Sequence, residues 1–107
     1  MNQYEPVIEW HETKNKTNIK KHGFSFDVAQ LVFLDEWMVM TDGGIVDNEQ
    51  RWNAIGRLSE HSDIKVTLLV SHTHNEKNGQ EVIRIVSARK AVPREVKLYE
   101  AKKRSKR

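Results

Sequence analysis

Apolar and polar residues alternate through the middle of the chain with the period that β-strands require. The predicted strands span residues 37–41, 51–58, 64–73 and 82–88. In the second of them the alternate positions are Trp52, Ala54, Gly56 and Leu58. A turn is expected at 42–44, and another at Asn78-Gly79, a pair that adopts positive backbone angles easily. Three or four of these strands are therefore expected to form an antiparallel meander.

Helix signals lie on both sides of these strands. The polar stretch 12–22 ends just before Gly23, and glycine after a basic last turn is the usual end of a helix. Ser25 is a good cap for a second short helix, and Pro93 suits the first position of a last one. A short β-prone segment at 7–10 precedes them all. This order of elements predicts an α+β fold.

Length and composition narrow the class of protein. The 107 residues are expected to form one domain spanning 1–107. The absence of cysteine excludes a disulfide scaffold, thiolate zinc sites and thiol catalysis, and it fits a reducing compartment. No apolar run approaches the ~20 residues that span a bilayer, and the first residues do not resemble a secretory signal. We therefore expect a soluble, cytoplasmic protein.

Positive charge is concentrated at the end of the chain. Residues 1–88 hold nine Lys and Arg against thirteen Asp and Glu, a net charge of −4. Residues 89–107 hold nine against two, a net charge of +7, and a basic tail is expected from about residue 101. Such segregation predicts a polyanionic partner, either nucleic acid or an acidic protein. The alternative is a solvated helix with a frayed basic end.

Arg84 is the most informative single residue. The residues that share its strand parity are Val82, Val86 and Ala88. On such an apolar face the guanidinium must either be paired or face a ligand. Arg51 and Arg57 share a parity on another strand, so one sheet face is expected to carry two or three guanidiniums, which match phosphate oxygens. The alternative is an interior Arg84 paired with a carboxylate such as Glu49 or Glu95.

Four further side chains have both a chemical and a structural interpretation. His22 ends the first helix. Its role there is either that of a general acid or base or that of a group that interacts with the helix dipole. His72 and His74 are expected at the end of a strand; no third ligand follows at a suitable spacing, so a hairpin end is favoured over a metal site. Tyr99 offers a phenol to phosphate or packs in the core. The three tryptophans are expected to fill the core.

Three blocks of sequence follow one another over about residues 7–100. The first comprises Glu9-Trp10, Lys14-Asn15 and 18–26, the second is 49–57, and the third is 83–91 with Glu95 and Tyr99. Together these blocks resemble the BrnT family of type II toxins. The resemblance implies a RelE-like fold, in which two N-terminal helices and a C-terminal helix flank a small twisted antiparallel sheet. It also implies a ribonuclease that halts translation.

The resemblance further implies a partner, a BrnA-like antitoxin with a ribbon-helix-helix DNA-binding domain. The two proteins would bind each other and repress their own operon. The active-surface residues that it implies are Lys21, His22, Arg51, Arg57, Arg84 and Arg89. Two departures from the family stand out: Val92 replaces a threonine that often caps the last helix, and the segment 72–80 is long.

The implied mechanism needs no metal and no cofactor. The substrate's 2′-OH attacks the adjacent phosphate and gives a 2′,3′-cyclic product. Arg84 and Arg57 are predicted to stabilise the phosphorane, with His22 as general acid or base. The residues predicted to bind RNA are Lys21, Arg51, Arg89 and Lys90. The competing function is a non-catalytic module that binds the antitoxin and nucleic acid as a transcriptional co-repressor.

Overall fold

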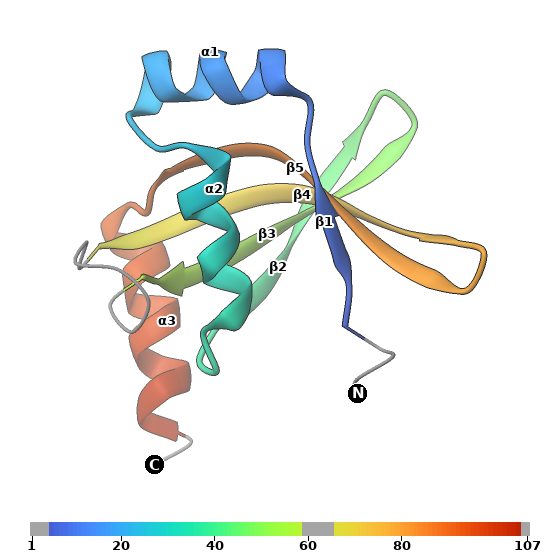
Figure 1. Ribbon diagram of the computed structural model, residues 1–107. Coiled ribbons are helices and arrows are strands. Elements are labelled where there is room, and N and C mark those ends of the chain that lie inside the picture. The colour runs from blue at the N-terminus through green and yellow to red at the C-terminus, as the bar shows by residue number, and fades with distance from the viewer. Residues whose placement is uncertain (1–4, 59–65, 106–107) are drawn as a thin grey trace.

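The computed structural model describes residues 5–58 and 66–105. Five strands form one sheet in the order β1-β5-β4-β3-β2 (Figure 1). The strands are β1 (Val7–Glu9), β2 (Val39–Val46), β3 (Glu49–Arg57), β4 (Thr67–Lys77) and β5 (Gln80–Lys90). The helices are α1 (Glu12–His22), α2 (Phe26–Ala29), the 3-10 helix η1 (Gln30–Leu34) and α3 (Pro93–Ser105). Ile64, expected to begin a strand, lies outside the described residues.

The α+β class and the antiparallel meander are confirmed, but the sheet as a whole is mixed. Strands β2 to β5 pair antiparallel in sequence order. Strand β1 joins the far edge parallel to β5, with Val7 opposite Val82 and Glu9 opposite Arg84. The expectation of an antiparallel sheet is therefore wrong for this strand, because the pattern of a three-residue strand carries no information about its direction.

The first hairpin turns later than expected. Residues 42–44 lie inside β2, where the pairing with β3 shifts register between Asp42 and Ile45. The bulge is held by Asp42, whose Oδ1 accepts hydrogen bonds from the Gly44 N–H at 2.7 Å and from Gln50 Nε2 at 2.8 Å. The turn itself is at Asp47 and the next residue, both with positive φ. Two glycines next to an aspartate indicate a turn and a bulge equally well.

The second hairpin confirms the turn at Asn78-Gly79, where both residues have positive φ. Its strands are longer than expected and pair without interruption from Lys77 and Gln80 back to His72. The long segment 72–80 is therefore a regular ladder closed by a two-residue turn. His72 and His74 lie within β4 and not at a hairpin end.

A bulge in this ladder changes which residues of β5 face the core. His72 is opposite Ile85, but Ser71 is opposite Ser87, so one residue of β5 is extra. Ile85 and Ala88 consequently belong to the same buried cluster although they are three residues apart. The parity that grouped Ala88 with Arg84 is therefore wrong, because strict alternation ends at the bulge.

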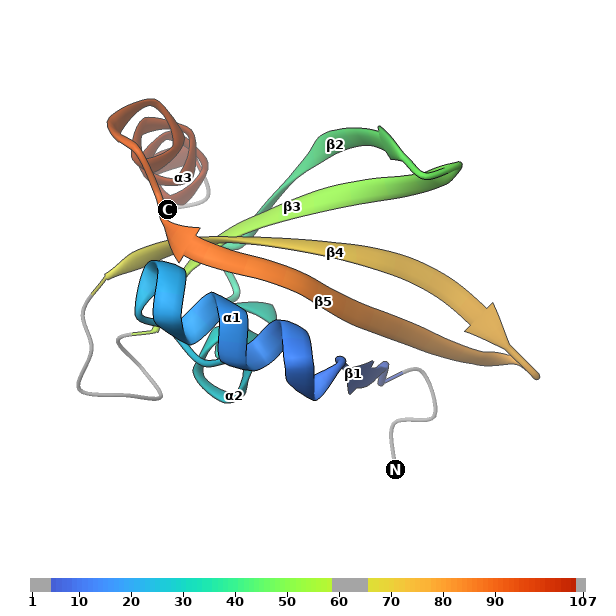
Figure 2. The same ribbon diagram turned by 90° about the horizontal axis from the view of Figure 1, so that it is seen from above.

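Helices cover the two faces of the sheet unequally. Helix α2 and η1 pack on one face, where Phe26, Ala29 and Val32 meet the apolar side of β3, β4 and β5. Helix α3 lies on the opposite face (Figure 2), and Tyr99 packs there against Ile55 and Leu69. Helix α3 contacts only β2 and β3 extensively, so the part of this face over β5 is not covered by it.

Helix α1 is held by polar side chains because it has almost no apolar face. Its buried residues are Asn15 and Asn18. Asn18 Oδ1 accepts the Ala88 N–H at 3.0 Å, and Asn18 Nδ2 donates to the Ala88 and Phe24 carbonyls at 2.8 and 2.9 Å. Asn15 Oδ1 accepts the Phe26 N–H at 2.8 Å. The two bonds to Ala88 fix α1 against the edge of β5, and the bond to Phe26 joins it to α2.

The predicted helix ends are confirmed. Gly23 ends α1 with a φ of 83°, and the Ser25 side chain accepts the Val28 N–H at 3.2 Å at the start of α2. Helix α2 is only one turn long and continues directly into η1.

Pro93 begins α3 as predicted. Glu95 accepts the Val92 N–H at 2.9 Å, so Glu95 caps the start of this helix although Val92 cannot. Helix α3 continues to Ser105, so the basic residues from about 101 are helical that far. Among residues 5–58 and 66–105, none of the helices combines the length and apolarity needed to cross a bilayer.

Candidate active-site groove

Two adjoining cavities run along β5 beside α1. The first, of about 300 Å³, is lined by Thr13, Lys14, Thr17, Asn18, Lys21, His22, Val86 and Ser87. The second, of about 190 Å³, is lined by His11, Lys14, Arg51, Arg84, Ile85 and Val86. Because they share Lys14 and Val86, we treat them as one feature and call it the β5 groove.

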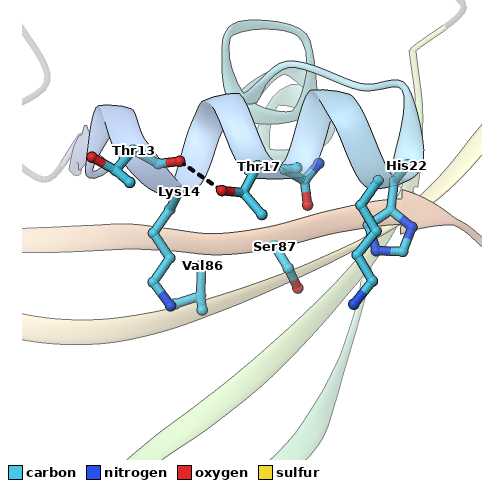
Figure 3. Close-up of a pocket in the computed structure, with 8 residues that line it drawn as sticks. Thr13, Lys14, Thr17, His22, Val86 and Ser87 are labelled. Carbon is cyan, nitrogen blue, oxygen red and sulfur yellow. Dashed lines mark hydrogen bonds between the residues drawn. The ribbon is translucent and has the colours of Figure 1, made fainter.

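Helix α1 supplies one wall of the β5 groove. Lys14 and Lys21 are seven residues apart, about two helical turns, so they lie on the same side of α1. Figure 3 shows Lys14 extending from the helix to Val86, with the His22 ring near the other end of the helix and Ser87 between them on β5. His22 is half-buried in the last turn of α1. An imidazole and two ammonium groups therefore face one space.

The sheet supplies the opposite wall, with Arg84 at its centre. Arg84 Nη2 donates to Glu49 Oε1 at 2.6 Å, so the paired interpretation of Arg84 is confirmed. Glu49 begins β3, and the β2–β3 and β4–β5 hairpins diverge toward their tips (Figures 1 and 2). The ion pair bridges the two hairpins. Its side chains are 31% and 33% exposed, so an anion from solvent can reach the guanidinium.

Two polar atoms near this ion pair lack partners. Arg51 Nε and Thr73 Oγ1 are buried and have no hydrogen-bond partner among the described residues. Thr73 is opposite Arg84 in the β4–β5 ladder, and Arg51 lines the same cavity as Arg84. Unsatisfied buried polar groups are rare in folded proteins and often mark functional sites.

Arg57 lies outside the groove lining. Its guanidinium is 4.9 Å from the centre of the Tyr99 ring, forms an ion pair with Glu100 and donates from Nε to Thr67 Oγ1 at 3.1 Å. Tyr99 is buried, and its hydroxyl donates to Asp35 Oδ2 at 2.7 Å. Burial and the Asp35 carboxylate raise the pKa of Tyr99 above its usual range. Tyr99 therefore has the packing role and not a phosphate contact.

Arg89 is also engaged elsewhere. Both of its terminal nitrogens donate to the Glu95 carboxylate at 2.9 Å. Lys90 is exposed at the end of β5. The β5 groove thus brings together Lys21, His22, Arg51 and Arg84 of the predicted site residues, but not Arg57, Arg89 and Lys90.

The two histidines of β4 share a face, as expected, in a third cavity of about 210 Å³ that Met40 and Trp52 also line. His72 is buried with its ring perpendicular to that of Phe33, and it contacts the Val70 carbonyl at 3.1 Å. Burial lowers the pKa of His72, so the ring is neutral near pH 7. Within the described parts of the chain, no group of three or more His, Asp or Glu is arranged to hold a metal ion.

The sequence patterns missed three residues: one lines the groove, one holds its wall, and one binds Tyr99 and Arg57 outside it. Lys14 lines both halves of the groove, and its seven-residue spacing from Lys21 is a signal that would have found it. Asn18 holds the wall in place through a backbone contact 70 residues away, which no local pattern reveals. Asp35 accepts hydrogen bonds from the Tyr99 hydroxyl and the backbone N–H of Arg57, again from distant segments.

Comparison with known proteins identifies the family. A comparison with curated proteins finds no match. A family model described as the ribonuclease toxin BrnT of a type II toxin-antitoxin system matches residues 10–95. The match includes every residue that lines the β5 groove and most of the chain. The chain therefore belongs to the BrnT family of ribonuclease toxins of type II toxin-antitoxin systems.

Proposed function

We propose that the β5 groove is where this toxin binds and cleaves RNA, and that cleavage needs no metal ion. The observation that carries the proposal is the charge of the lining. It contains the cations Lys14, Lys21, Arg51 and Arg84 with two histidines, and Glu49, the carboxylate that pairs with Arg84, lines neither cavity. Such a surface attracts phosphates, while the remainder of the described chain up to residue 88 is rich in acidic residues.

The proposed reaction uses the substrate's own 2′-OH. The 2′-oxygen bonds to phosphorus, the bond to the 5′-oxygen breaks, and a 2′,3′-cyclic phosphate remains. Arg84 stabilises the phosphorane through its planar fork of donors. His22 transfers a proton, as the base for the 2′-OH or the acid for the departing 5′-oxygen. Lys14, Lys21 and Arg51 hold the neighbouring phosphates.

Glu49 sets a condition on substrate binding. Its carboxylate accepts the same Arg84 N–H that a phosphate oxygen would accept. A bound phosphate therefore displaces Glu49 or shares the guanidinium with it. Arg57 contacts the phosphorane only if its own contacts with Glu100 and Thr67 open, so its role in stabilising the phosphorane stays a prediction, as do the phosphate contacts of Arg89 and Lys90.

The wider function follows from the family. The toxin has an antitoxin partner, because it belongs to a type II system. We extend the proposal to inhibition of translation through RNA cleavage, to neutralisation by a BrnA-like ribbon-helix-helix antitoxin, and to repression of the shared operon by the complex on operator DNA. The RelE-like architecture implied by the sequence belongs to the same proposal, and the helices on both faces of the five-stranded sheet are compatible with it.

The test compares RNA cleavage by purified variants in the presence of a chelator. We expect Arg84→Ala and His22→Ala each to slow cleavage of end-labelled RNA by at least about 100-fold. Arg104→Ala, the same truncation at an exposed arginine outside the groove, is expected to cleave at the unaltered rate. The product from the unaltered protein should carry a 2′,3′-cyclic phosphate.

The controls separate failure of the site from failure of the fold. Each variant is checked for an unchanged unfolding midpoint before its activity is compared. Unaltered cleavage by folded Arg84→Ala would remove Arg84 from the site, and cleavage abolished by the chelator would contradict the metal-free reaction. Cleavage of no RNA, with or without ribosomes, would support the non-catalytic binding module instead.

A further inference from the structure

Helix α3 has an outer face with one sign of charge. Its exposed side chains recur at spacings of three and four residues, which places them on a single side of the helix. We call five of them the α3 outer face: Arg94, Lys97, Leu98, Ala101 and Arg104. Pro93 and Ser105, at the two ends of the helix, are also exposed. None of them lines the β5 groove. The cations on this face therefore lie outside the proposed cleavage site.

Both carboxylates of α3 form their ion pairs toward the sheet, and Arg94 is the cation of this face that also acts on Glu95, at longer range. Glu95 accepts hydrogen bonds from both terminal nitrogens of Arg89. Glu100 forms an ion pair with Arg57. Arg94, Lys97 and Arg104 form no ion pair with any described residue. The outer face is thus a row of cations free to interact with an acidic partner.

An apolar side chain lies among these cations. Leu98 is 46% exposed, with Lys97 beside it, Arg94 one turn before it and the small residue Ala101 one turn after it. A nucleic-acid backbone offers phosphates but little that would bury a leucine. A protein segment with acidic residues around an apolar one complements both features at once.

We infer that the α3 outer face docks an acidic, amphipathic segment of the antitoxin. The inference rests on the antitoxin that a type II toxin requires, and it does not depend on the cleavage chemistry proposed for the β5 groove. Leu98 is the apolar anchor, and the surrounding cations pair with carboxylates of the partner. Because the face lies on α3 and not in the groove, the antitoxin can hold the toxin without first displacing Glu49 from Arg84.

The experiment titrates the purified cognate antitoxin onto the full-length toxin in a calorimeter. We expect Leu98→Asp to weaken the dissociation constant at least about 100-fold, since it removes the anchor and adds repulsion. The triple variant Arg94→Glu, Lys97→Glu and Arg104→Glu should weaken it to a similar extent. The double variant Lys16→Glu and Lys20→Glu, on the exposed side of α1, is the matched control and should change it less than threefold.

RNA cleavage by the free variants provides the second measurement. Variants of the α3 outer face should cleave RNA at the unaltered rate, since all the substituted side chains are exposed. Antitoxin affinity that stays unaltered in both α3 variants would overturn the inference. Loss of RNA binding with antitoxin affinity intact would also overturn it and assign the face to nucleic acid. If Leu98→Asp does not fold, Leu98→Ser replaces it, with a loss of about tenfold expected.

Failure here and failure of the groove proposal give different results. If the groove is not the cleavage site, the Arg84 and His22 variants cleave RNA as fast as the unaltered protein, whatever their antitoxin affinity. An incorrect docking face shows in the titration alone, even when Arg84→Ala abolishes cleavage.

Discussion

Single charged side chains in this toxin divide into those with a partner inside the fold and those that face solvent or a ligand. Arg89 donates from both terminal nitrogens to Glu95, while Arg84 donates from one nitrogen to a carboxylate beside the groove. Both are arginines on β5 five residues apart, and charge alone does not distinguish them. What distinguishes the two arginines is the position of the carboxylate that each one binds, and this position depends on the folded structure.

Glu95 links the charge of this region to its stability. Hydrogen bonds from Arg89, and a further one from the Val92 N–H, hold the pKa of Glu95 below its ordinary value of 4.5. A carboxylate whose pKa is lower in the folded state stabilises the fold above the unfolded-state pKa, and this contribution is lost as the pH falls through the folded-state pKa.

We therefore expect Glu95→Gln to lower the free energy of unfolding by about 2 kcal/mol at pH 7, because a charged, largely buried hydrogen-bond acceptor is lost. The difference from the unaltered protein should shrink as the pH falls from about 4.5 through the lower folded-state pKa, because Glu95 is then protonated first in the unfolded and finally in the folded protein. Urea unfolding at several pH values measures it. A difference that is the same at pH 3 and pH 7 would show that the carboxylate charge does not contribute.

At the scale of helices and strands, the features that depend on local chemistry could be predicted from the sequence. Gly23, Ser25 and Pro93 marked helix ends correctly because each acts through its own backbone or side chain. The bulges in β2 and β5 were not predictable, since they depend on pairing with another strand. Because of one extra residue at the β5 bulge, the predicted parity assigned Ala88 to the wrong face of the sheet.

Helix α1 provides a test at this scale, because Asn18 joins it to Ala88 of β5 by two hydrogen bonds and donates a third to the Phe24 carbonyl. We expect Asn18→Ala to lower the free energy of unfolding by about 3 kcal/mol, since buried backbone groups of Ala88 and Phe24 lose their partners. Thr17→Ala, the neighbouring exposed position whose hydroxyl only returns to Thr13, should change it by less than about 0.5 kcal/mol. Urea unfolding measures both, and equal losses would show that the amide has no special role.

At the scale of the whole molecule, the groove is assembled from α1, β3 and β5, which lie far apart along the chain. Strand parity pointed to Arg51 and Arg84, the helix end pointed to His22, and the family resemblance added Lys21. The fold places these four residues on facing walls. Arg57 and Arg89 belong to equally recognisable blocks but are held by carboxylates of α3. Sequence identifies the basic residues, whereas tertiary contacts decide which of them face the groove.

The assembled charge predicts how RNA binding responds to salt. Four groove cations that each neutralise a phosphate on a single strand give a slope of roughly −3 in log affinity against log salt. Arg84→Ala should make the slope shallower by about 0.7, while Lys97→Ala on α3 should leave it unaltered. Binding of 2′-O-methyl RNA, which lacks the attacking hydroxyl, measures affinity without cleavage. A slope near zero would show that phosphates are not held by these cations.

The amide of Asn18 also protects the molecule from self-association. Beyond the short strand β1, the edge of β5 would present unpaired backbone groups, and such edges recruit strands from other chains. At Ala88 the side chain of Asn18 occupies both the donor and the acceptor of that edge. Helix α1 thus blocks the addition of a foreign strand to β5 at Ala88. Loss of the amide should therefore promote edge-to-edge association as well as unfolding.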